Sequence, residues 1–273
     1  MVIINPATSV WCSYYSRFAA FLHAHGFDVI TYDYRGIGGS RPASLRGLHA
    51  GWLDWGRLDF EAGLRLASST FPRQPEQVVA HSIGGVLVGL APSNHLIDRV
   101  FTMGAQFAHG RDYAIHKRFG MLIKSHAIMP VLDNGADPKL IFDDIANLIR
   151  LARVDFGIEI TTSDETPKQP KTLRINFDHV ALSFHEFAKR PECIAVRLIT
   201  RFPNDLHGQI LVIKPRLTTM ASHDVWEYRQ DMDSFPHEST ADQFFNDVQW
   251  ECHRALGESE AKCLFATGRR RSD

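Results

Sequence analysis

The chain has 273 residues, of which 44% are hydrophobic and 22% are charged, and its formal net charge at pH 7 is −1. A chain of this length can bury a large core, and a protein of this size commonly forms one domain with an insertion. The small net charge gives no electrostatic reason to expect binding to nucleic acid or to an anionic membrane, so neither partner is expected.

The first predicted elements alternate between strand and helix. Residues Val2–Ile4 are a short apolar run that predicts a strand, and the loop Asn5-Pro6-Ala7-Thr8 follows it. Apolar residues at helical spacing over Tyr14–His25 predict a helix, which Gly26 is placed to end. A second strand is predicted over Phe27–Tyr32.

The same alternation continues after the second strand. A glycine-rich loop over 33–40 comes first, helical spacing returns over Trp52–Leu66, and Pro72 and Pro75 break the chain before a third apolar run. Asp33 and Arg35 lie in the glycine-rich loop, a place that favours a loop-holding pair over catalysis. The order β-α-β-α-β-α, with strands that are continuous apolar runs, predicts an α/β protein with a mostly parallel sheet and helices on both faces.

The third strand leads directly into a serine. Residues Val78–Gly85 read Val-Val-Ala-His-Ser-Ile-Gly-Gly, and an apolar helical segment follows. A nucleophile elbow needs this strand–turn–helix, with small residues two places before and after the serine, because the turn strains the serine backbone. Ala80 and Gly84 occupy those positions around Ser82. An ordinary serine in a strand-to-helix loop is the alternative interpretation of this motif.

Residues 111–170 interrupt the regular alternation. Helical spacing over 116–132 and 140–154 is separated and followed by loop-like stretches, which predicts a helical lid inserted above the sheet. We therefore expect the N-terminal part of the core at 1–110, the lid at 111–170, the C-terminal part of the core at 171–257 and a disordered tail at 258–273.

The N-terminal segments resemble those of the α/β-hydrolases, and within them a group of predicted bacterial serine hydrolases of the serine aminopeptidase and esterase type. The resemblance runs from Ile3 to about Pro130 and thins beyond that point. It implies the α/β-hydrolase fold and a serine hydrolase activity. The segments that carry it are 3–8, 26–29, 32–40, 52–56 and 81–85.

The resemblance also suggests a base and an acid for Ser82. In this fold the acid and then the histidine follow the serine along the chain. Ser222–Arg229 is similar to the family's histidine segment, which implies His223 as the base; the alternatives are His207 and His237. Glu186 falls near the place of the family's acid, after a strand predicted over Val180–Phe184; the alternatives are Asp178 and Asp205.

An oxyanion hole completes the predicted site. The residue after the nucleophile supplies one backbone N–H, here that of Ile83, and the loop after the first strand supplies the other, here from Ala7 or Thr8. The expected substrate is a small-molecule carboxylic ester or other acyl compound, with an amide as the less favoured class. The alternative is a non-catalytic binding or interaction protein on the same fold.

Neither a cofactor nor a metal is expected. Gly36-Ile37-Gly38-Gly39 lacks the spacing of a dinucleotide fingerprint, and the four cysteines are widely separated, without the spacing of metal ligands. We expect reduced thiols, a cytoplasmic location and no membrane span. The sequence leaves the acyl length and the oligomeric state open. The cysteines are Cys12, Cys193, Cys252 and Cys263.

Overall fold

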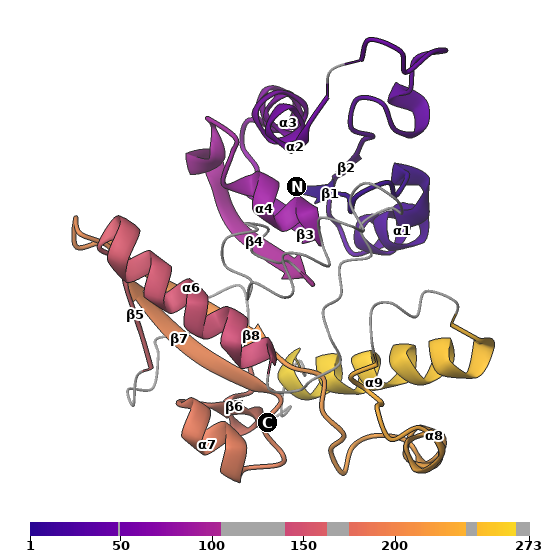
Figure 1. Ribbon diagram of the computed structural model, residues 1–273, viewed down its shortest axis with the longest axis vertical. Helices are drawn as coiled ribbons and strands as arrows, with labels where there is room; N and C mark the ends of the chain where they lie inside the picture. Colours follow the sequence, from indigo (N-terminus) through magenta and orange to yellow (C-terminus); the bar gives the residue numbers. More distant parts are fainter. Residues whose placement is uncertain (49, 105–139, 163–174, 239–244, 266–273) are drawn as a thin grey trace, which may run out of the picture. The chain divides into compact units, whose positions relative to one another are not determined.

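The computed structural model describes residues 1–48, 50–104, 140–162, 175–238 and 245–265 (Figure 1). The chain divides into two compact units, Met1–Ala114 and Ile115–Asp273. Each unit is built around its own sheet, and the two are described separately below.

The first unit is organised around a four-stranded parallel sheet. Its strands are paired in the order β2-β1-β3-β4. Ile3 pairs with Ile30 on one side and with Val78 on the other, so the N-terminal strand lies inside the sheet. The strands are β1 (Val2–Asn5), β2 (Val29–Thr31), β3 (Glu76–His81) and β4 (Ile97–Met103).

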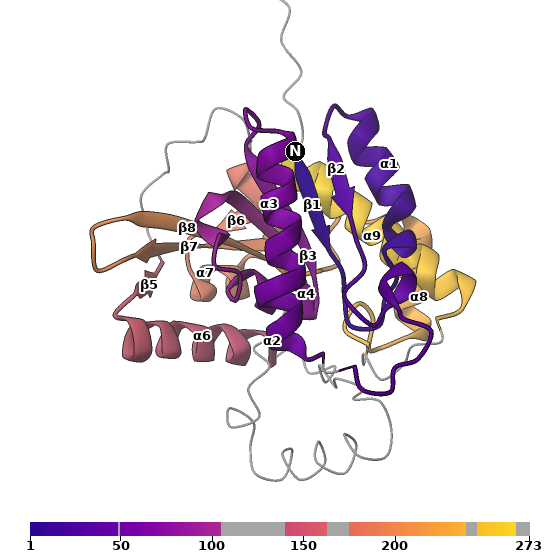
Figure 2. The same cartoon turned by 90° about the horizontal axis from the view of Figure 1, so that it is seen from above.

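Helices cover both faces of this sheet, as the sequence predicts (Figures 1 and 2). The alternation of side chains along a strand sends Ile3 to one face and Ile4 to the other. Ile3 packs in a cluster with Leu64 of α3, whereas Ile4 packs in a cluster with Leu22 of α1. The helical segments are η1 (Cys12–Tyr15), α1 (Ser16–Ala24), η2 (Gly38–Ser40), α2 (Trp52–Asp54), η3 (Trp55–Phe60), α3 (Glu61–Thr70), α4 (Ile83–Val88) and η4 (Asn94–Leu96).

The second unit contains a smaller mixed sheet. Its central strand is β7, which pairs with β8 in an antiparallel hairpin along its whole length. On its other edge β7 pairs with β6 in parallel and with β5 in antiparallel orientation. The strands are β5 (Glu159–Thr161), β6 (Val180–Ala181), β7 (Ala195–Arg201) and β8 (His207–Ile213).

Helices also pack on both faces of the second sheet. Val196 and Leu198 cluster with Ala152 of α6, and Ala195 on the opposite face clusters with Leu264 of α9. The helical segments are α6 (Leu140–Phe156), η6 (Phe177–His179), α7 (Phe184–Lys189), α8 (His223–Asp231) and α9 (Asp247–Phe265).

Two predicted boundaries are wrong. The strand predicted over Val180–Phe184 ends at Ala181, because Ser183 caps α7 by accepting a hydrogen bond from the backbone of Glu186. The predicted start of a disordered tail at residue 258 is too early, because α9 continues to Phe265 and buries Leu264 in the core. Residues 266–273 lie outside the described residues.

Much of the predicted lid also lies outside the described residues, which omit 105–139 and 163–174. The described part of the 111–170 segment forms α6 and β5. Strand β5 belongs to the second sheet, and its Ile160 is buried in one cluster with Ala152 of α6, so this part of the segment is built into the core of the second unit. The lid itself stays a prediction.

Glu260 gives the second unit a pH-dependent stability. Its side chain is buried on α9, and Oε1 accepts a hydrogen bond from the backbone N–H of Arg216 at 2.6 Å. Burial raises the pKa of Glu260 to about 7, and the bond from Arg216 offsets only part of that effect. Between a pH of about 4.3 and 7, the folded protein therefore holds a proton that the unfolded chain has lost, and stability falls as pH rises.

Glu260→Gln is expected to remove this dependence. The glutamine amide stays neutral and can still accept the hydrogen bond from Arg216. The free energy of unfolding of the variant, relative to that of wild type, should therefore rise by on the order of 2 kcal/mol between about pH 5 and pH 8. Urea titrations at both pH values measure it. Glu258→Gln on the exposed side of α9 is the control, and equal pH profiles for wild type and Glu260→Gln would contradict the prediction.

Candidate active site

Ser82 lies at the junction between β3 and α4. Its backbone angles are φ 53° and ψ −118°, a left-handed conformation that a residue with a side chain rarely adopts. The Ser82 N–H donates to the carbonyl of Met103 at the end of β4, 2.8 Å away, and the Ser82 carbonyl accepts from Gly85. The strained turn predicted for an elbow is therefore present at this serine.

The two small neighbours of Ser82 are required by packing. A Cβ on Gly84 would lie 2.5 Å from the carbonyl oxygen of Asn5 and 3.0 Å from that of Pro6. Ala80, two residues before the serine, is completely buried in the cluster that contains Ile3. The close approach at Gly84 brings the first turn of α4 against the loop that follows β1.

The two segments expected to form the oxyanion hole meet at this contact. Ile83 is the first residue of α4, where backbone N–H groups have no partner within the helix. In the loop after β1, the Ala7 N–H already donates to the hydroxyl of Tyr15 at 3.0 Å. The Thr8 hydroxyl is buried, and within the described ranges no residue accepts a hydrogen bond from it or donates one to it.

His81, the neighbour of the serine, is held by the same tyrosine. Its Nδ1 lies 2.9 Å from the Tyr15 hydroxyl. Because that hydroxyl oxygen accepts from Ala7, its hydrogen is available to His81 Nδ1, which favours the tautomer protonated on Nε2. Burial lowers the pKa of His81, so the ring stays neutral at pH 7. This arrangement indicates a structural role for His81 beside the elbow.

Asp33 and Arg35 both hold loops, but they do so with other partners. Asp33 accepts hydrogen bonds from the backbone of Cys12 at 2.7 Å and of Gly39 at 2.9 Å. Arg35 pairs with Asp59 of η3 at 2.7 Å, and the same carboxylate accepts the Arg35 N–H. They are therefore structural residues, as predicted, but not as a pair with each other.

A polar network that the sequence analysis did not single out lies beneath the elbow. Asn5 is completely buried and donates from Nδ2 to the carbonyl of Gly84 at 2.7 Å. Its Oδ1 accepts from the hydroxyls of Tyr32 and Tyr34, and Tyr34 also reaches the carbonyl of Pro6. The sequence signal that could have indicated this network is an asparagine at the end of an apolar strand, followed by two tyrosines at the end of the next strand. A polar side chain buried at such a place needs hydrogen-bond partners.

The predicted base lies in the second unit. His223 is the first residue of α8, and 88% of its side chain is exposed. Its Nε2 lies 3.3 Å from Oε1 of Glu227, one turn further along α8. Of the two alternatives, His207 is exposed at the start of β8, whereas burial and nearby cations, Lys214 first among them, lower the pKa of the half-buried His237.

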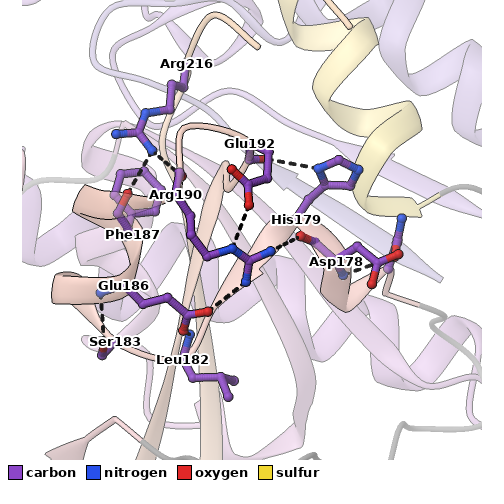
Figure 3. Close-up of polar contacts among 10 residues, drawn as sticks. Asp178, His179, Leu182, Ser183, Glu186, Phe187, Arg190, Glu192 and Arg216 are labelled. Carbon is purple, nitrogen blue, oxygen red and sulfur yellow. Dashed lines mark hydrogen bonds and ion pairs between the residues drawn. The ribbon is translucent and has the colours of Figure 1, made fainter. Parts of the chain in front are cut away.

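The predicted acid, Glu186, is bound by residues that flank α7 (Figure 3). Its Oε1 pairs with Arg190 at 2.7 Å, and its Oε2 accepts the N–H of Leu182 at 2.7 Å. These contacts, that with Arg190 first, lower the pKa of Glu186. The carboxylate thus closes a capping arrangement with Ser183, in which each side chain accepts a backbone N–H.

Glu186 and His223 are not brought together by the second unit. Helix α7, which carries Glu186, and helix α8, which begins at His223, lie apart in both views (Figures 1 and 2). Of the alternative acids, Asp178 lies in η6, where its carbonyl accepts from Arg190, and Asp205 lies in the turn between β7 and β8 with a φ of 61°. The identity of the acid remains a prediction.

The described residues contain no group of three or more histidine, cysteine, aspartate or glutamate side chains that could hold a metal ion. All four cysteines are free thiols. Over the same described ranges, no helix combines the length and the apolar character that crossing a membrane requires.

Comparison with known proteins agrees with the fold. A search of curated proteins and a search of solved structures both returned no match. The sequence model of the family described as "Serine aminopeptidase, S33" matches residues 2–153, more than half of the 273-residue chain and the whole elbow region. The chain therefore belongs to this serine aminopeptidase family of α/β-hydrolases.

Proposed function

We propose that this protein is a serine hydrolase that cleaves carboxylic esters through an acyl-enzyme on Ser82. The observation that carries the proposal is the strained backbone of Ser82 at the β3–α4 junction. Family membership supports a serine hydrolase of the α/β-hydrolase type. The ester substrate and the residue roles are the further steps of the proposal.

In the proposed reaction, Ser82 Oγ attacks the ester carbonyl while its proton passes to the imidazole of His223. The bond to the alcohol oxygen then breaks, and the alcohol leaves with that proton. Water attacks the acyl-enzyme by the same route and releases the carboxylic acid. An elbow serves this chemistry because it exposes the serine oxygen at the C-terminal end of its strand, next to the helix N-terminus.

For the oxyanion, we propose Ile83 N–H and Thr8 as the two donors. Helix α4 begins at Ile83, so the partial positive charge of the helix N-terminus also favours the developing anion. Thr8 is preferred to Ala7 because the Ala7 N–H is donated to Tyr15, whereas the buried Thr8 hydroxyl has no partner among the described residues. An unpaired buried hydroxyl gains a hydrogen bond when a ligand oxygen arrives.

A non-catalytic role is the second candidate function, and specific observations favour it. Glu186 already has Arg190 and Leu182 as partners, and His223 is paired with Glu227, an exposed residue of its own helix. In a related triad, loss of the acid that orients the histidine lowers kcat by on the order of 10⁴-fold. A chain with this arrangement could retain the elbow and bind acyl compounds without turning them over.

Labelling with a fluorophosphonate probe separates the two functions. Labelling of the folded wild type is expected, and His223→Ala should abolish it while His207→Ala, an exposed histidine in the same unit, should not. Rates on p-nitrophenyl esters and on aminoacyl p-nitroanilides then decide between ester and amide, since the family description names an aminopeptidase. A folded wild type that neither labels nor hydrolyses either substrate would favour the non-catalytic role.

The same assays identify the acid. Glu186→Gln and Glu227→Gln preserve shape and remove one charge each, in α7 and α8 respectively. If Glu186 is the acid, only its variant should lose esterase activity. A loss confined to Glu227→Gln would instead assign the acid to the carboxylate that the structure places beside His223.

A further inference from the structure

The oxyanion hole proposed above needs two donors from segments that are far apart in the chain. One is the loop 6–8 after β1, and the other is the first turn of α4. Donors of this kind must be held within about 0.5 Å of their working positions, because the charge that they stabilise exists only in the transition state. Some contact must therefore set the distance between these two segments.

Asn5 makes that contact. Its Nδ2 donates to the carbonyl of Gly84, 2.7 Å away in the first turn of α4. Asn5 is 0% exposed, and its backbone carbonyl touches the face of Gly84 that lacks a side chain. One residue thus joins the end of β1 to α4 through its side chain and its main chain.

Tyr34 holds the other side of the loop. Its hydroxyl lies 2.7 Å from Asn5 Oδ1 and 2.9 Å from the carbonyl oxygen of Pro6, and donates to both as a shared bond. The ring is completely buried and stacks on Trp55 with the centroids 4.8 Å apart. Burial raises the pKa of Tyr34 far above its usual value, so the hydroxyl remains a donor throughout the working pH range.

We propose that Asn5 and Tyr34 are positioning residues, which hold the Pro6–Thr8 loop against α4 so that both oxyanion donors point at one site. This inference rests on the proposed hydrolase function. The alternative role for the network is stability alone, since a buried polar group must be paired wherever it lies. The two roles differ in what they predict for the transition state.

Tyr32 offers a matched control within the same network. Its hydroxyl also donates to Asn5 Oδ1, and its ring also lies near Tyr34, but only Tyr34 has a hydrogen bond to Pro6 in the loop. Tyr32→Phe and Tyr34→Phe each delete one buried hydroxyl and leave the ring in place. A purely structural role predicts similar effects of the two changes.

The experiment measures kcat, KM and melting temperature for both variants on the best ester, together with the inhibition constant of an alkyl trifluoromethyl ketone. That inhibitor forms a serine adduct whose oxygen anion occupies the oxyanion hole. Tyr34→Phe is expected to lower kcat about 10-fold, to leave KM within about 2-fold, and to weaken the inhibitor by the same factor as kcat. Tyr32→Phe should change these constants less than about 3-fold.

Asn5→Asp is the second variant, because it keeps the shape and the acceptor for both tyrosines. The ionised carboxylate cannot donate to the Gly84 carbonyl, so kcat should fall about 10-fold or more at pH 8. Protonation restores a donor, so the ratio of variant to wild-type kcat should recover as pH is lowered.

Equal effects of Tyr34→Phe and Tyr32→Phe, or a loss of melting temperature with kcat and inhibitor affinity unchanged, would overturn the positioning role alone. The proposed function is tested separately, by ester hydrolysis and ketone binding of the wild type. If the wild type fails to hydrolyse esters or to bind the ketone, both the function and this inference fall.

Discussion

Ser82→Ala is expected to abolish both fluorophosphonate labelling and ester hydrolysis. The hydroxyl is the only group at the elbow that can form the acyl bond, and removing a catalytic serine costs about 10⁴-fold or more in kcat. The strained backbone at Ser82 does not depend on the hydroxyl, so the variant should fold as the wild type does. Mass spectrometry of the labelled protein and steady-state kinetics measure the two effects.

Ser69→Ala is the control for this change. Ser69 lies on the exposed side of α3, where its hydroxyl bonds to the carbonyl of Leu66 within the same helix. It should keep full labelling. Labelling that persists in Ser82→Ala would place the reactive group elsewhere in the chain and would remove the basis of the proposed function.

Among the substitutions proposed as tests, Gly84→Ala is expected to lower the free energy of unfolding most. The new Cβ would lie 2.5 Å from the Asn5 carbonyl oxygen and 3.1 Å from its carbon, and backbone atoms cannot rotate away as a side chain could. Overpacking of this kind costs roughly 1 to 3 kcal/mol or more, which exceeds the gain of about 1 kcal/mol for alanine over glycine in a helix. Chemical denaturation at neutral pH measures the difference.

Gly257→Ala gives the opposite expectation in the same chain. Gly257 lies inside α9, and among the described residues no atom outside the adjacent backbone of α9 and the two chain neighbours comes within 4 Å of the Cβ that it would gain. The substitution should therefore stabilise the protein by about 0.5 to 1 kcal/mol. If Gly84→Ala proves as stable as wild type, the close approach of α4 to β1 does not hold in solution.

Activity should follow stability in Gly84→Ala. To relieve the clash, α4 must move away from the loop after β1, and these are the segments that carry Ile83 and Thr8. A variant that folds at low temperature should therefore have a lower kcat than wild type. A folded variant with full kcat would show that the spacing of these segments is not set at Gly84.

The sequence was sufficient to predict the first unit because its signals are local. A short apolar run, a break and a helical pattern repeat three times, and a parallel sheet covered by helices is the arrangement that such repeats favour. The small residues Ala80 and Gly84, two places before and after Ser82, likewise predict a strained turn, because larger side chains there would clash. The structure shows this turn at Ser82. These features depend on neighbours within a few residues.

The second unit was harder to predict because its contacts connect distant residues. Glu186 was predicted as the acid, and in the structure its contacts are local: its N–H donates to Ser183 and its carboxylate pairs with Arg190, the residues at the two ends of α7. A pattern of one acid after a strand cannot distinguish a catalytic carboxylate from one that closes a helix cap. The early end of β6 has the same cause, since the cap at Ser183 starts α7.

The sequence by itself determined the fold class, the elbow at Ser82 and the family, all of which follow from local pattern and motif spacing. Only the tertiary structure decided which polar groups meet beneath the elbow. Asn5 and Gly84 are 79 residues apart, and Asn5 and Tyr34 are 29 residues apart. Their hydrogen bonds form because parallel pairing aligns the ends of β1, β2 and β3, and a buried amide in that position must find its partners there.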